Sequence, residues 1–86
     1  MLEAVKLALR ITTDAFDAEL TGLINAARKD LELADVNMIA QNEPLTTRAI
    51  ILYCKAHFGD LPNAERFAKS YEMLKISLAL AGDYRV

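Results

Sequence analysis

The stretch from Thr46 to Phe58 reads TTRAIILYCKAHF, and its apolar residues surround almost the whole circumference of the helix that they predict. Only Arg48 and Lys55 mark a polar side of this helix. A helix that is apolar on nearly all sides is covered by its neighbours, because its side chains avoid water. The stretch therefore predicts the central and most buried helix of the fold, with Thr46 or Thr47 as its N-terminal cap.

Three further segments carry apolar residues at steps of three and four, the spacing that places side chains on one face of a helix. They run over residues 2–10, 12–33 and 60–81, and the first of them is short. The β-branched residues are sparse and do not alternate with polar ones, so strands are not expected. The expected core-facing residues are Leu2, Val5 and Leu9, then Phe16, Leu20, Leu23, Ile24, Ala27, Leu31 and Ala34, and finally Ala64, Phe67, Tyr71, Leu74 and Leu78.

Polar residues separate these helices. Residues 12–14 (TTD) provide side-chain acceptors for the first N–H groups of the second helix, and Asp60 or Asn63 does so for the last. The periodicity fades over residues 35–45, which predicts a connecting loop of roughly ten residues. The whole chain, residues 1–86, is thus expected to be a single all-α domain. We expect a compact bundle of about four helices, one short and N-terminal and three longer, with a flexible C-terminal tail.

The composition limits the classes of function. Apolar residues make up 53% of the chain and charged residues 26%, enough for a core and unlike a disordered segment. The net charge of -2 gives no strong field to attract polyanions, so tight nonspecific binding of nucleic acid is disfavoured. The longest apolar run, Ala49–Cys54, is far shorter than the ~20 residues that span a bilayer, so no membrane segment is expected. We also expect no signal peptide, and the single cysteine fits a reducing cytosol.

Candidate catalytic groups are few. Cys54 and His57 stand three residues apart on the central helix, where their side chains can meet. A catalytic thiolate needs an exposed, electropositive site, and the aliphatic neighbours of this pair favour a core or boundary role instead. The acidic group Asp14, Asp17 and Glu19 is explained by the positive end of a helix. The sequence therefore predicts no catalytic residue, no metal and no cofactor, and the protein is not expected to be an enzyme.

The last helix has a second apolar face. At 100° per residue, Met73, Ile76 and Leu80 fall together on the side opposite the core-facing stripe. A small monomer usually buries such a patch, so either the first helix or the tail folds over it, or it is a subunit interface. The tail adds Tyr84 and Arg85, residue types enriched at interface anchors. These five residues form the predicted interface.

Several segments carry a resemblance to a known family. They are VKLALRI (5–11), LTGLINAAR (20–28), AIILYCKAHF (49–58), SYEMLK (70–75) and GDYR (82–85). In their order and character they resemble the small head-tail connector proteins of tailed bacteriophages and prophages, also described as DNA-packaging proteins. The resemblance covers nearly the whole chain and rests on hydrophobic patterns with a few polar marks.

This resemblance implies a structural adaptor of the virion head-tail junction, made in the bacterial cytoplasm. Such proteins assemble as a homo-oligomeric ring beneath the portal, contact portal and tail-completion proteins, and help in DNA packaging, DNA retention and tail attachment. DNA passes through the channel without sequence-specific binding. The alternative is a small helical regulatory protein that binds a protein or DNA partner. A footprint on duplex DNA that weakens steeply as the salt concentration rises would favour this alternative.

Overall fold

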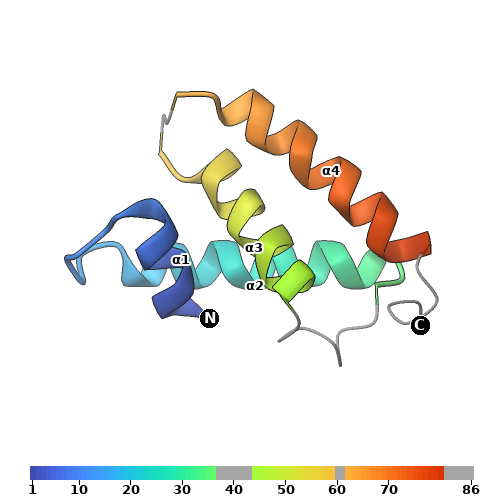
Figure 1. Cartoon of the computed structure of the whole chain (residues 1–86). Helices are drawn as coiled ribbons and strands as arrows, with labels where there is room; N and C mark the ends of the chain where they lie inside the picture. The colour runs from blue at the N-terminus through green and yellow to red at the C-terminus, as the bar shows by residue number, and fades with distance from the viewer. Residues whose placement is uncertain (37–43, 60–61, 81–86) are drawn as a thin grey trace.

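The computed structural model describes residues 1–36, 44–59 and 62–80. These residues form four helices: α1 (Leu2–Leu9), α2 (Asp17–Leu33), α3 (Pro44–His57) and α4 (Ala64–Leu80) (Figure 1). The all-α prediction, with one short helix followed by three longer ones, is confirmed. The predicted tail and residues 37–43 of the predicted loop lie outside the described residues.

Helix α3 lies at the centre of the fold, as predicted. Helices α1, α2 and α4 all pack against α3, and the contact between α3 and α4 is the most extensive one (Figure 1). Ala49, Ile50 and Cys54 are fully buried, and Leu52 is nearly so. Burial of one large aliphatic side chain contributes about 1.5–3 kcal/mol, so Ile50 and Leu52 make α3 an important part of the core.

The predicted caps of α3 are wrong. The helix includes Pro44, whose fixed φ and missing N–H suit the first turn of a helix. Thr46 consequently lies inside the helix, and its side chain is fully buried. Thr47 is also a helical residue, so neither threonine is the residue that precedes α3.

Helix α2 begins later than predicted. Its first residue is Asp17, and Phe16, which has no side-chain acceptor, precedes it. The Oγ1 atom of Thr13 accepts a hydrogen bond from the N–H group of Ala15 at 3.2 Å, and the Asp17 N–H donates to the Asp14 carbonyl at 3.2 Å. The TTD residues therefore stabilise a turn before the helix rather than its first turn. The predicted end at Leu33 is confirmed.

The predicted core-facing stripes are confirmed in part. Val5 of α1 is fully buried, as are most of the marked residues of α2, and Tyr71 and Leu78 of α4 are almost fully buried. The other residues of the stripes, including Leu23 and Leu74, are partly exposed. Phe16 is 42% exposed although its ring packs edge-on against Phe58 at 5.4 Å. Asn63 directly precedes α4 and its carbonyl accepts a hydrogen bond from the Phe67 N–H, while Asp60 lies outside the described residues.

Candidate assembly surface

The outward face of α4 is apolar over its last turns. Met73, Ile76 and Leu80, hereafter the α4 face, are 69%, 56% and 73% exposed. Tyr71 and Leu78, on the other side of the same helix, are only 3% and 2% exposed. The two sets differ because residues two positions apart point about 200° away from each other. The helix thus presents one apolar face to the core and a second one to solvent.

The structure decides one of the alternatives for this face. Helix α1 packs against α2 and α3, and the α4 face remains exposed, so the prediction that α1 folds over it is wrong. The other candidate cover, the tail with Tyr84 and Arg85, lies outside the described residues. The interface assignment of all five residues stays a prediction.

Other exposed apolar side chains were not singled out by the sequence patterns. Leu7 is 81% exposed on α1, and Leu33 is 74% exposed at the end of α2. Both stand off the core-facing stripe of their helix, Leu7 two residues after the buried Val5 and Leu33 two residues after the buried Leu31. The helical projection at 100° per residue that predicted the α4 face would also have placed Leu7 and Leu33 on the outward sides of their helices.

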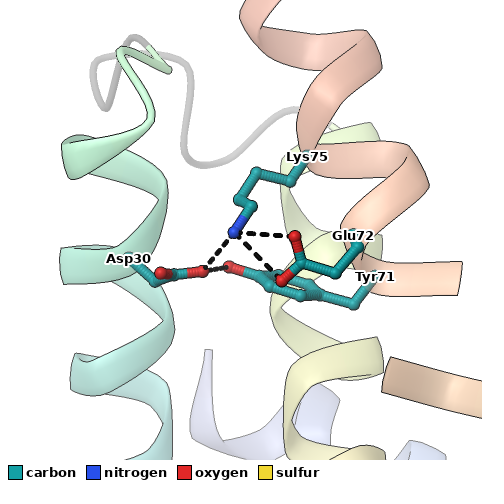
Figure 2. A network of polar contacts seen from close by, with 4 residues as sticks. All are labelled: Asp30, Tyr71, Glu72 and Lys75. Carbon is teal, nitrogen blue, oxygen red and sulfur yellow. Dashed lines mark hydrogen bonds and ion pairs between the residues drawn. The ribbon is translucent and has the colours of Figure 1, made fainter. Parts of the chain in front are cut away.

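A polar network joins α2 to the C-terminal half of α4 (Figure 2). The hydroxyl of Tyr71 donates to the Oδ2 atom of Asp30 at 2.6 Å, and the Lys75 ammonium donates to the same oxygen at 3.1 Å. Lys75 also pairs with the Glu72 carboxylate at 3.0 Å. We call Asp30, Tyr71, Glu72 and Lys75 the α2–α4 clasp. Because Tyr71, Glu72 and Lys75 belong to the same helix as the α4 face, the clasp fixes that helix relative to α2.

The clasp shifts the pKa values of its members. Burial alone would raise the pKa of Asp30, but the hydrogen bonds from Tyr71 and Lys75 outweigh it and leave this pKa lowered. Burial would lower the pKa of Lys75, whereas its contacts with Glu72 and Asp30 leave it raised. Burial and the bond to Asp30 both raise the pKa of Tyr71. At neutral pH the carboxylate and the ammonium are therefore charged and the phenol is protonated.

The directions of these pKa shifts predict how the free energy of unfolding depends on pH. The contribution of Asp30 is present above its unfolded pKa, about 4, and is lost as the pH falls through its lower folded pKa. The contributions of Lys75 and Tyr71 are present at neutral pH and are lost as the pH rises above about 10, because their folded pKa values are raised. Urea unfolding from pH 2.5 to 11 measures both limbs.

The matched variant for the acid limb is Asp30→Asn. Between pH 4 and pH 2.5, wild type is expected to lose on the order of 0.5 kcal/mol more than this variant, a small effect because Asp30 is 37% exposed and solvent screens the pair. Parallel stability curves for the two proteins over this range would show that Asp30 carries no pH-dependent stabilisation.

A second ion cluster ties α1 to the start of α2. The ammonium of Lys6 lies 3.0 Å from the Asp14 carboxylate and 2.9 Å from that of Asp17, with only 10% of its side chain exposed. The hydrogen bonds to Asp17 and Asp14 raise the pKa of Lys6. The acidic residues at this position thus pair with a buried cation, which the sequence patterns did not reveal, while Glu19 lies in the first turn of α2 as expected.

Cys54 is a core residue. Its side chain is fully buried, and burial raises the pKa of the thiol to about 11, so the thiol stays protonated at neutral pH. His57 lies at the exposed end of α3, where its ring packs against Tyr53 with centroids 4.4 Å apart. The predicted core role is confirmed for Cys54, whereas His57 is exposed and the prediction of a core or boundary role is wrong for it.

The described residues hold no group of three or more His, Cys, Asp or Glu side chains arranged to bind a metal ion. An open hollow of about 530 Å³ at the start of α4 is lined by charges of both signs, including Glu65, Arg66 and Lys69, with no convergent set of ligands. None of the helices within residues 1–36, 44–59 and 62–80 has the length and apolarity needed to cross a bilayer.

The family model described as "Phage connector protein" matches residues 1–85, which is nearly the whole chain. No curated protein and no solved structure matches the chain.

Proposed function

The chain belongs to the phage connector protein family, and from this we propose that it is a non-enzymatic structural adaptor of the virion head-tail junction. In this role it assembles as a ring under the portal, helps in packaging and retention of DNA, and provides the surface to which the tail attaches. Its partners are further copies of itself, the portal and tail-completion proteins. The observation that supports assembly is the exposed α4 face.

The α4 face has the properties of an unfilled interface. Its three large side chains are each more than half exposed, although a fully buried side chain of this size gains about 1.5–3 kcal/mol. On one rigid helix they form a continuous strip, and the clasp holds that helix in place, so little conformational entropy is lost on docking. Tyr84 and Arg85 follow α4 in the sequence and complete the proposed interface.

The charge of the chain suits a passive channel for DNA. Proteins grip duplex DNA chiefly through Lys and Arg contacts with phosphates. This chain has 10 Lys and Arg against 12 Asp and Glu, so a ring of copies has no net cationic surplus to hold the duplex. DNA is then free to slide through the ring, and the same balance disfavours the alternative of a DNA-binding regulator.

Charged substitutions on the α4 face test the proposal. The double variant Ile76→Asp, Leu80→Asp is expected to keep the helical fold, because both side chains are exposed, and to abolish formation of tailed particles. Burial of two carboxylates in an apolar contact costs several kcal/mol per interface. The measurement is the yield of infectious particles when the variant replaces wild type, with circular dichroism and urea unfolding of the purified chain.

The matched control is Thr21→Asp, Asn25→Asp. It adds the same two charges, four residues apart, on the exposed side of α2. The control is expected to give wild-type particle yields. Normal yields from the folded α4 double variant would remove the α4 face from the interface and with it the main physical support for the adaptor.

A further inference from the structure

We infer that the Met73 end of the α4 face of one copy docks against the outward side of α1 in the next copy, an assignment that rests on the proposed ring. A ring is closed by a head-to-tail interface, which needs two different patches on each subunit. The α4 face is one of them. Leu7, the most exposed large apolar side chain of the described residues, supplies the other.

The two patches lie on different sides of the subunit. Helices α1 and α4 both pack against α3, and Figure 1 shows them flanking it. Leu7 points away from the core because it stands two residues after the buried Val5. The α4 face points away from the core for the same reason. A subunit can therefore offer α4 to one neighbour and α1 to the other at the same time.

The charges beside the two patches are complementary. Four residues before Leu7, on the same side of α1, stands the exposed Glu3. Four residues before Met73, on the same side of α4, stands the exposed Lys69. Two helices that dock in parallel through Leu7 and Met73 thus bring Glu3 opposite Lys69. Equal spacing and opposite sign favour this register, in which Met73 contacts α1, while Ile76 and Leu80 lie past Leu9, the last residue of that helix.

The α1 patch is also held rigidly. Lys6, next to Leu7, is fixed by its ion pairs with Asp14 and Asp17, which tie α1 to the turn that leads into α2. A patch that is already ordered loses little entropy on binding. The contact is nevertheless small, since α1 has eight residues and a length of about 12 Å. A single contact of this size is weak, so the ring gains its stability from closure and from the partners at the junction.

Cysteine cross-linking tests the assignment. Two variants are prepared, Leu7→Cys and Met73→Cys, and are assembled into particles separately or as an equal mixture before mild oxidation. The native Cys54 does not compete, because it is buried and its thiol is protonated. We expect a disulfide-linked pair of chains in the mixture and in neither variant alone. A mixture of Thr21→Cys and Met73→Cys, in which the first position is exposed on α2, is the control and is expected to give no linked pair.

The outcomes separate this assignment from the proposed function. A linked pair in Met73→Cys alone would show that two α4 faces meet each other, which overturns the role of α1 but keeps α4 as an interface. Absence of the mixed pair in assembled particles would also overturn the role of α1. The proposed function is tested independently, by the effect of the double variant Ile76→Asp, Leu80→Asp on particle yield.

Exchange of the two charges gives a second readout. Glu3→Lys or Lys69→Glu is expected to lower the yield of the mixed cross-link by about two- to fivefold, the range for one exposed ion pair. The two exchanges made together restore the pair with reversed polarity and are expected to recover the yield. Losses that simply multiply in the combined variant would contradict the pairing of Glu3 with Lys69.

Discussion

Replacement of Leu78 by alanine is expected to lower the free energy of unfolding by about 3 kcal/mol, whereas Leu80→Ala should change it by less than about 0.5 kcal/mol. The two leucines stand two residues apart on α4 and lose the same atoms. Leu78 is 2% exposed and its removal leaves a cavity against the core, while Leu80 is 73% exposed and leaves none. Urea unfolding followed by circular dichroism measures both values.

The same pair of variants separates folding from assembly. An 86-residue domain has a total stability of about 4–13 kcal/mol, so Leu78→Ala weakens the fold strongly but leaves the α4 face intact. At a temperature where both proteins remain folded, Leu80→Ala should reduce particle yield more than Leu78→Ala. Equal destabilisation by the two substitutions would contradict the orientation of α4, and an unchanged yield with Leu80→Ala would argue against its place in the interface.

The clasp between α2 and α4 gives the second large effect. Asp30→Ala is expected to destabilise the fold by about 1.5 kcal/mol, mostly because the nearly buried Tyr71 hydroxyl then has no carboxylate to accept its hydrogen bond. Tyr71→Phe removes the hydroxyl itself and should cost about 1 kcal/mol. The double variant is expected to cost about 1 kcal/mol less than the sum, since both changes remove one shared interaction.

A matched substitution controls for loss of charge on α2. Glu32→Ala also removes an acidic side chain from the last turns of α2, but Glu32 is exposed and lies 3.8 Å from the exposed Lys29. Its effect is expected to stay below about 0.5 kcal/mol. Additive costs in the Asp30 and Tyr71 double variant would mean that the 2.6 Å contact contributes nothing to the coupling of the two helices.

The secondary structure was largely predictable because each helix carries its own signal. Apolar residues at steps of three and four marked α1, α2 and α4, and the nearly all-apolar stretch AIILYC identified α3 as the central helix. The helix starts were less predictable. A threonine has the same chemistry whether it caps a helix, closes a turn as Thr13 does, or is buried inside a helix as Thr46 is. Which of these occurs depends on neighbours far away in the sequence.

The candidate interface was also predictable from the sequence only in part. Helical periodicity alone separated Met73, Ile76 and Leu80 from the core-facing side of α4, because the angle between residues of one helix is fixed by local geometry. Whether another element covers that face is a question of tertiary packing, and only the arrangement of α1 against α2 and α3 showed that α1 does not. The pairing of Asp30 with Tyr71 and Lys75 joins residues more than 40 positions apart, so no local pattern could reveal it.

The sequence by itself determined the number of helices, their core-facing sides and the second apolar face of α4, since all of these follow from the repeat of one helix. The tertiary structure alone decided which apolar residues remain in solvent, which charges meet, and that Lys6 is buried between two carboxylates. The physical reason is that exposure and ion pairing depend on distances between helices, whereas periodicity records only the angles within each of them.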